Sequence, residues 1–195
     1  MKKQTNRITN VCLWAGAWLL IVAAVVLICW QWGIRSSEEK AASYVLEVRT
    51  RIPEPQSAPV EERKDNTMAV LSIDGRDFVG ILEMPKYGSS MPVCADWGEV
   101  FKYPCRLDGS VYDRTIQIGA TTQKGQYDFY RDISVSDGVF FTDMEGNSYH
   151  YTVTDIRYEK HADQVALQRE DAALTLFIKN VYALEYIIVF CDVVS

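Results

Sequence analysis

The sequence is poor in the residues that most often bind metals and carry protons. Only two of its 195 residues are histidines, His150 and His161, and neither stands in a metal-ligand spacing with cysteine or acidic residues. The acidic segment 143–147 is too short for a calcium loop and lacks the glutamate that ends one. These absences give no reason to expect a metal site.

Glycine-rich phosphate loops, internal repeats and low-complexity tracts are also missing. The first absence removes the usual backbone cradle for a nucleotide cofactor. Positive charge is scarce in residues 68–195, where 11 lysines and arginines face 19 aspartates and glutamates. A region with a net charge near −8 is poorly suited to bind nucleic acid or anionic lipid. We therefore expect no cofactor and no nucleic-acid partner.

One long apolar run stands near the N-terminus. Residues 11–34 carry no charge, and about 20 helical residues are enough to cross the hydrocarbon core of a bilayer. The alternative is a cleaved signal peptide, which has a shorter apolar core followed by small residues at the cleavage site. This run ends instead in Trp30 and Trp32, which suit a membrane interface. The pattern predicts an uncleaved transmembrane anchor.

The charges that flank this run predict its orientation. Lys2, Lys3 and Arg7 precede it without any acid, whereas Glu38 and Glu39 follow it closely. The positive-inside rule places the N-terminus in the cytoplasm and the rest of the chain outside. We therefore divide the chain into four parts: a cytoplasmic N-terminus (1–10), a transmembrane anchor (11–34), a stalk rich in proline and charge (35–67), and an external domain (68–195).

The external domain contains many short runs of β-branched and aromatic residues, of which 174–191 is the clearest. Its periodicity is compatible with a buried helix, but its length and the break at Asn180 favour a hairpin. The other predicted strands are 68–73, 77–84, 114–118, 138–142 and 148–158, and short helical stretches are expected near 128–132 and 164–170. Seven or eight short strands with little helix predict a closed barrel or a sandwich.

An ordered series of motifs in this domain resembles the sortases, the membrane-anchored cysteine transpeptidases of Gram-positive cell surfaces. The motifs are FVGILEMP with a following MPV, YPCRLDGSVY, RTIQIGATTQ, ISVSDGVFFTDMEGNSYHYTV, LTLFIKN and YIIVFC. The resemblance covers nearly all of 68–195, together with the anchor and the stalk. It implies an all-β fold, a closed eight-stranded barrel with short helices, preceded by one transmembrane helix.

The same resemblance points to three positions where the family carries its chemistry. Sortases bring a histidine, a cysteine nucleophile and an arginine to one peptide carbonyl, and these positions fall on Thr121, Lys179 and Tyr186. Threonine carries no proton near neutral pH, lysine has no thiol, and tyrosine offers one donor in place of a guanidinium's five. An amine-activated hydroxyl is an alternative, but a hydrogen bond that fills vacated space is the simpler interpretation. We predict that the transpeptidase machinery is lost.

Three cysteines lie in the external domain, and three roles remain open for them. Cys94, Cys105 and Cys191 are buried small hydrophobic residues, or Cys105 and Cys191 form a disulfide, or one of the three is a displaced nucleophile. The first role is favoured, because His150 and His161 are both expected at the surface.

The aromatic residues Trp97, Phe101 and Tyr103 lie in a segment without a strand pattern. They belong either to the core, which we favour because it is the usual place of aromatics, or to an exposed patch suited to peptide or protein binding.

These observations lead to a functional hypothesis: a single-pass cell-surface protein whose sortase-like domain binds without cleaving. The expected partners are the membrane, reached through the N-terminal helix, and a sorting-signal-like peptide, a surface protein or an active sortase. The first alternative is a working sortase-type transpeptidase or hydrolase that uses Cys94, Cys105 or Cys191. The second is a purely structural surface domain.

Overall fold

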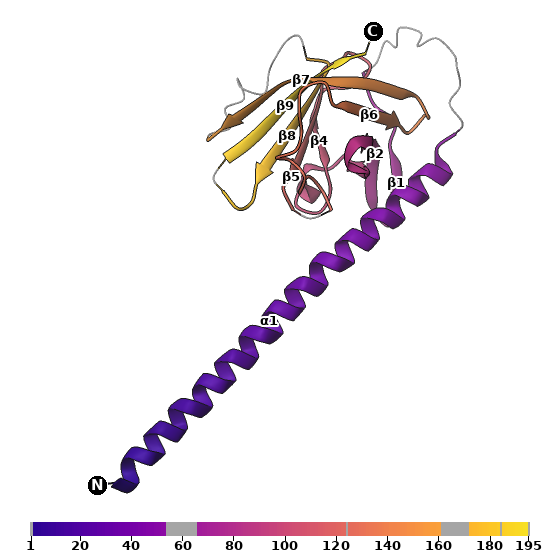
Figure 1. Ribbon diagram of the computed structural model, residues 1–195. Helices are drawn as coiled ribbons and strands as arrows, with labels where there is room; N and C mark the ends of the chain where they lie inside the picture. The colour runs from indigo at the N-terminus through magenta and orange to yellow at the C-terminus, as the bar shows by residue number, and fades with distance from the viewer. Residues whose placement is uncertain (1, 54–65, 124, 161–171, 184, 195) are drawn as a thin grey trace. The chain divides into compact units, whose positions relative to one another are not determined.

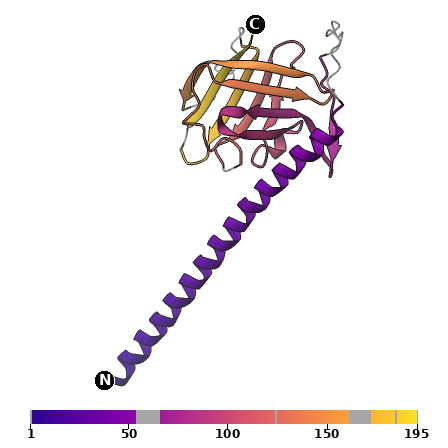
Figure 2. The same cartoon turned by 45° about the vertical axis from the view of Figure 1, so that its right-hand side comes forward.

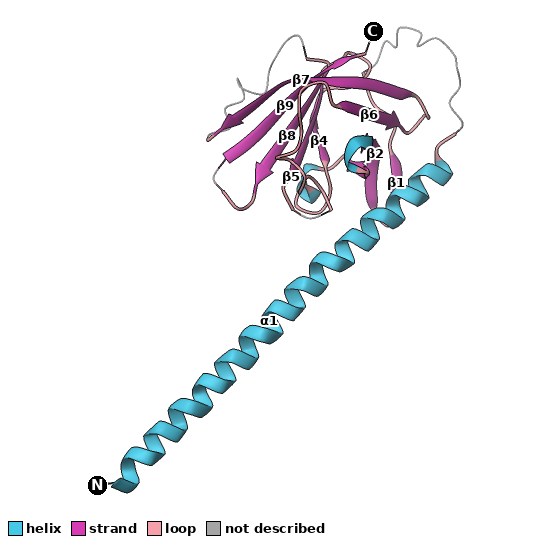
Figure 3. Cartoon of the chain, viewed as in Figure 1, coloured by secondary structure: helices cyan, strands magenta, loops and turns pink. Residues whose placement is uncertain are grey.

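The computed structural model describes residues 2–53, 66–123, 125–160, 172–183 and 185–194. The chain forms two compact units, Met1–Glu38 and Glu39–Ser195. Helix α1 (Lys2–Arg51) supplies the first unit, and its last turns belong to the second. The other described elements are strands and two single-turn 3-10 helices, η1 (Pro85–Tyr87) and η2 (Trp97–Glu99) (Figure 3).

Within the part of the chain that the structure describes, no helix combines the length and the apolar composition needed to cross a membrane. Several side chains of the predicted anchor, including Trp30 and Trp32, lie outside the described residues. Those that are described, such as Trp18 and Leu20, are exposed on α1. The anchor therefore stays a prediction.

The strands of the second unit form a single sheet that closes on itself (Figure 1 and Figure 2). The strands are β1 (Leu71–Ile73), β2 (Arg76–Met84), β3 (Ser89–Cys94), β4 (Cys105–Asp108), β5 (Ile116–Thr121), β6 (Gly138–Asp143), β7 (Ser148–Glu159), β8 (Leu174–Asn180) and β9 (Glu185–Val193). Their order is β1-β2-β3-β4-β5-β8-β9-β7-β6, and β6 pairs back onto β2. Strands β2 to β9 thus make the predicted closed eight-stranded barrel, while β1 pairs only with the start of β2.

Two strands of the barrel were not among the predicted ones. Strand β3 contains Pro92, which lacks the backbone donor a central strand needs. It is tolerated because β3 meets β4 through one residue pair, Cys94 opposite Cys105, so most of that edge is open. Strand β4 has only four residues, too few to show a pattern.

The predicted short helix at 128–132 is wrong. This segment is a series of turns, with backbone hydrogen bonds from Tyr130 N to Tyr127 O and from Asp132 N to Phe129 O. Its aromatic side chains belong to the core or pack against it, and this tertiary packing determines the local conformation. The other predicted helix, 164–170, lies outside the described residues.

Strand β8 shows how the barrel wall is built. Leu174, Leu176 and Ile178 point into the main core, where each is fully buried. Burying a side chain of this size contributes about 1.5–3 kcal/mol. Phe177 and Lys179 alternate with them on the outer face of the wall, where Phe177 packs with Ile188 and Phe190 of β9. The outer face of the wall at β8 and β9 is therefore partly apolar.

A second apolar cluster lies where the last turns of α1 pack on the barrel. Tyr44, Val45 and Val48 share one face of the helix and are buried against Phe78 and Ile81, among others. Residues 39–52, which the sequence assigns to the stalk, therefore contribute to the compact unit that contains the barrel.

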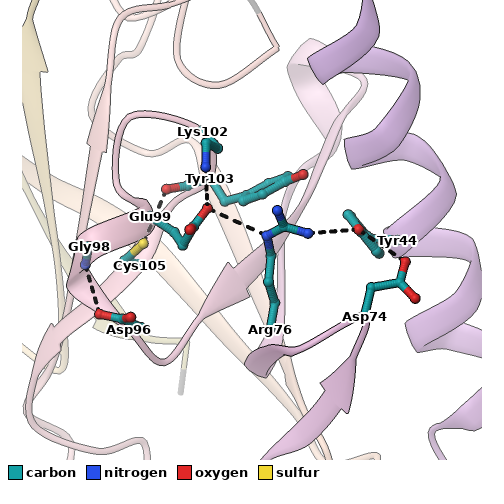
Figure 4. Close-up of polar contacts among 9 residues, drawn as sticks. All are labelled: Tyr44, Asp74, Arg76, Asp96, Gly98, Glu99, Lys102, Tyr103 and Cys105. Atoms are coloured by element: carbon teal, nitrogen blue, oxygen red, sulfur yellow. Dashed lines mark hydrogen bonds and ion pairs between the residues drawn. The ribbon is translucent and has the colours of Figure 1, made fainter.

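Polar contacts surround this cluster (Figure 4). The Arg76 guanidinium donates to the Tyr44 hydroxyl at 2.9 Å and lies 3.5 Å from the Glu99 carboxylate, while the Tyr44 hydroxyl donates to Asp74 at 3.3 Å. Arg49 of α1 also pairs with Glu83 of β2. The helix end is thus connected to β2 and to the segment after β3.

We predict that Gly80→Ala destabilises the barrel where it closes. A Cβ at Gly80 would lie 2.2 Å from the Phe141 ring and 2.6 Å from the backbone oxygen of Thr142 on β6, so the backbone itself must move. Such overpacking costs about 1–3 kcal/mol of unfolding free energy, measured by urea denaturation.

The matched control is Gly138→Ala, in the neighbouring strand. Its Cβ would meet the Phe140 ring at 3.5 Å, an ordinary contact, so a change within about 0.5 kcal/mol is expected. Equal unfolding midpoints for the two variants would contradict the prediction.

Candidate binding groove

The sheet places the three predicted site positions in one row across neighbouring strands. The parallel pairing of β5 with β8 sets Thr121 opposite Lys179, and the antiparallel pairing of β8 with β9 sets Lys179 opposite Tyr186. Directly paired residues project to the same face of a sheet. All three side chains therefore start from the outer face of the barrel wall.

The three side chains do not meet in one open site. Thr121 is fully buried, and its hydroxyl accepts a hydrogen bond from Gln123 N at 3.4 Å, while its backbone N donates to Gln126 Oε1 at 2.8 Å. Among the hydrogen bonds of the described residues, none joins Thr121 to Lys179. The threonine stabilises the turn after β5 and does not face the groove beside it.

Lys179 and Tyr186 line an open groove with a volume of about 1030 Å³, at the upper end of the range for ligand sites. The groove lies beside the β8–β9 hairpin, and the segment after β3 supplies one wall. Its described lining residues are Phe101, Gln123, Lys160, Lys179, Asn180, Val181, Tyr182, Ala183, Glu185 and Tyr186. This lining combines aromatic surface with two amines and one carboxylate.

Lys179 and Tyr186 are held differently. The Tyr186 ring stacks on Phe177, with centroids 5.0 Å apart and planes inclined by 14°, so it forms a fixed wall. The Lys179 ammonium lies 5.8 Å from the centre of the Phe101 ring, a cation–π contact, and its side chain is exposed. An exposed ammonium beside aromatic surface suits a ligand that carries both a carboxylate and an apolar side chain.

Asn180 is the residue of this site whose role the sequence did not reveal. It is buried, and its amide nitrogen donates to the Tyr130 hydroxyl at 3.2 Å and to Glu185 at 3.3 Å. Its amide oxygen accepts from Tyr182 N at 3.0 Å and from the Thr122 hydroxyl at 3.4 Å. A single side chain thus connects the groove loop to the barrel. In the sequence it shows only as a polar break in an apolar run.

The aromatic segment after β3 divides between core and surface. Tyr103 is buried, as expected, but Trp97 is 41% exposed and Phe101 56% exposed, so the core prediction is wrong for these two. The Trp97 ring lies directly on Gly119 of β5, where an added Cβ would come within 2.1 Å of it. Trp97 covers the outer wall beside Thr121, and Phe101 lines the groove.

The three cysteines of the barrel are all buried and lie away from the groove lining. Contact with the Cys94 thiol, together with burial, raises the pKa of Cys105 far above its ordinary value. Burial likewise raises the pKa of Cys191. Both shifts oppose formation of the thiolate that nucleophilic attack requires.

The disulfide alternative between Cys105 and Cys191 is wrong. Cys105 lies on β4 and Cys191 on β9, three strand spacings apart in the sheet, or about 14 Å, whereas bridged cysteines have Cα atoms within about 7 Å. His150 is exposed on β7, with its ring against Phe140, and His161 lies outside the described residues.

Comparison with solved structures identifies the fold. Sortase A from Corynebacterium diphtheriae matches with a TM-score of 0.53 and 16% identity, covering 83% of this chain and 84% of that one. Sortase C-3 from Streptococcus pneumoniae gives 0.51 and 15%, with 83% and 85% covered. Sortase C-1 from Actinomyces oris gives 0.51 and 15%, with 80% and 99% covered. Neither a protein-family model nor a curated protein matches the sequence. The chain has the sortase fold.

We predict that Asn180→Ala destabilises the barrel by about 1–3 kcal/mol, because it removes partners from the buried hydroxyls of Thr122 and Tyr130. Urea denaturation measures the loss. Hydrogen exchange of residues 181–183 should also become faster.

Asn66→Ala provides the control. Asn66 is exposed and its amide contacts Asp113 at 2.9 Å at the surface, so its loss should cost less than about 0.5 kcal/mol. If Asn180→Ala is equally mild, the buried network does not support the groove loop.

Proposed function

We propose that this chain is a membrane-anchored, non-catalytic member of the sortase family that binds peptides in its outer groove at the Gram-positive cell surface. The sortase fold supports the family assignment, and the ordered motifs of the sequence agree with it. The observation that carries the functional proposal is the side chain at the centre of the row. It is Lys179, an exposed amine at the position that the family resemblance gives to the nucleophile.

The surroundings of Lys179 support binding over acyl transfer. Acyl transfer by a sortase needs a thiolate, a proton carrier and a cationic donor at one carbonyl. The lining of the groove supplies the amine of Lys179 and the phenol of Tyr186, and the described lining residues include no thiol and no imidazole. The buried cysteines, with the raised pKa values of Cys105 and Cys191, weaken the alternative of a displaced nucleophile.

The shape and composition of the groove favour an extended peptide as ligand. The groove is open to solvent, and its volume of about 1030 Å³ is large enough for several side chains of a peptide. Phe101, Tyr182 and Tyr186 provide apolar contact, and Lys179 provides an anion partner. A peptide with apolar side chains and a carboxylate satisfies both kinds of group.

We predict that Lys179→Gln weakens peptide binding about tenfold, which corresponds to about 1.4 kcal/mol, because it removes the cation while keeping the side chain's reach. Binding is measured by the fluorescence anisotropy of a labelled sorting-signal peptide added to the full-length chain in detergent. Mass spectrometry of the same mixture should show intact peptide and unmodified protein.

The control is Arg51→Gln, which removes the same charge from an exposed residue of α1 that pairs with Glu47 of the same helix. It should bind the peptide like the unaltered chain. Cleavage of the peptide with an acyl adduct on the protein would refute the non-catalytic proposal. Equal binding by Lys179→Gln and the unaltered chain would refute the groove as the site.

We also propose that residues 11–34 anchor the chain, with the barrel outside the cell. The support is an uncharged run that falls within a helix, α1, and large apolar side chains such as Leu20 and Val25 that are exposed on it. Exposed apolar side chains are unfavourable in water and favourable in lipid.

We predict that changing Leu20 and Val25 together to aspartate releases much of the chain from the membrane pellet after alkaline extraction. Each charge costs about 2.5–3.5 kcal/mol at the centre of a spanning helix. Changing both residues to alanine should leave the chain in the pellet. Retention of the aspartate variant would argue against a spanning anchor.

A further inference from the structure

Two cysteines of the barrel lie opposite each other. Cys94 is the last residue of β3 and Cys105 the first of β4, and they form the one residue pair that joins these strands. Neighbouring parallel strands lie about 4.8 Å apart, within the range of Cα separations, about 4.4–6.8 Å, that a disulfide spans. Because paired residues project to the same face, both thiols enter the same apolar cluster beneath α1.

The two thiols are also in contact. The Cys94 thiol is the main cause of the raised pKa of Cys105. The Cys105 thiol donates to Tyr103 O at 3.3 Å (Figure 4), and the backbone N of Cys94 donates to Pro104 O at 2.8 Å. The segment 95–104 therefore forms a loop whose two ends meet in the sheet, at the pair Cys94 and Cys105.

This segment supplies the groove with an aromatic wall. Phe101 lines the groove and contacts Lys179, and Trp97 covers the wall beside it. Glu99 of the segment pairs with Arg76 of β2 at 3.5 Å and, within the segment, with Lys102 at 3.1 Å. The pair with Arg76 is only partly buried, and such ion pairs contribute little stability, so a covalent link between Cys94 and Cys105 would restrict the segment further.

We propose that Cys94 and Cys105 form a disulfide under oxidising conditions, closing segment 95–104 into a covalent loop and fixing Phe101 at the edge of the groove. In this step the two thiols lose two protons and two electrons as the S–S bond forms. The oxidant is a disulfide of a small thiol, such as oxidised glutathione, which reacts through a mixed disulfide and leaves as two thiols.

Burial determines when this bond forms. Cys94 is 1% exposed and Cys105 is fully buried, so an oxidant does not reach them in the folded barrel. The bond therefore forms during folding, or when segment 95–104 opens. Once formed, it is protected from reduction by the same burial. Cys191 remains a free thiol, because it lies in the separate main core on β9.

The test compares the same full-length chain in two states. The chain is refolded in detergent either with dithiothreitol or with a mixture of reduced and oxidised glutathione, then denatured, alkylated and digested. After oxidative refolding, mass spectrometry should show alkylation of Cys12, Cys29 and Cys191 and a peptide pair linked through Cys94 and Cys105. Alkylation of all five cysteines, or a dominant link to Cys191, would overturn the proposal.

A second measurement tests the effect on the segment. Deuterium uptake by residues 97–103 should fall several-fold in the oxidised chain relative to the reduced chain, while uptake by β8 should be the same in both. In Cys94→Ala, the two refolding conditions should give equal uptake. A disulfide that forms without lowering uptake would refute the fixed segment. Peptide binding is measured separately, so failure here is distinguishable from failure of the proposed function.

Discussion

The pairing of β6 with β2 is the constraint on which the rest of the structure depends, because it turns a sheet into a closed barrel. Closure gives each strand one inner and one outer face. The inner face carries most of the large aliphatic side chains, while Lys179 and Tyr186 start from the outer face. Gly80 lies at this junction, where the two strands approach so closely that a Cβ has no room. The outward position of Thr121, Lys179 and Tyr186 thus depends on barrel closure as well as on the local sequence.

The outer wall of the barrel carries a row of three paired positions, Thr121, Lys179 and Tyr186. Lys179 of β8 and Tyr186 of β9 lie directly opposite each other in the hairpin. Under the proposed function, the amine of Lys179 and the phenol of Tyr186 serve binding and do not attack a carbonyl. Thr121, the third member of the row, is buried and accepts a hydrogen bond in the turn that follows β5. The amine, the phenol and the neighbouring aromatic surface are the features on which the proposed peptide binding rests.

The parts of the fold that the sequence reveals are those with strong local patterns. The β8–β9 hairpin could be predicted, because the β-branched runs and the short loop leave few alternatives. Strand β3 could not be predicted, because Pro92 argues against a central strand. The proline is accommodated because β3 pairs with β4 at only one residue pair. Thr121 is held by a hydrogen bond from its backbone N to the Gln126 side chain. Phe101 reaches Lys179 because the segment between β3 and β4 folds against the barrel wall. Such features arise from tertiary packing and produce no periodic pattern in the sequence.

The packing of Tyr44 and Val48 on the barrel has a mechanical consequence. In chain order, these residues come before the proline-rich stretch that leads to β1, so a pull on the N-terminus would reach the helix contact first and that stretch only after the contact gives way. Tension on the chain would therefore be borne first by the apolar interface that Tyr44 and Val48 make with the barrel. Arg76, which touches both Tyr44 and Glu99, would pass part of that load to the segment that carries Phe101.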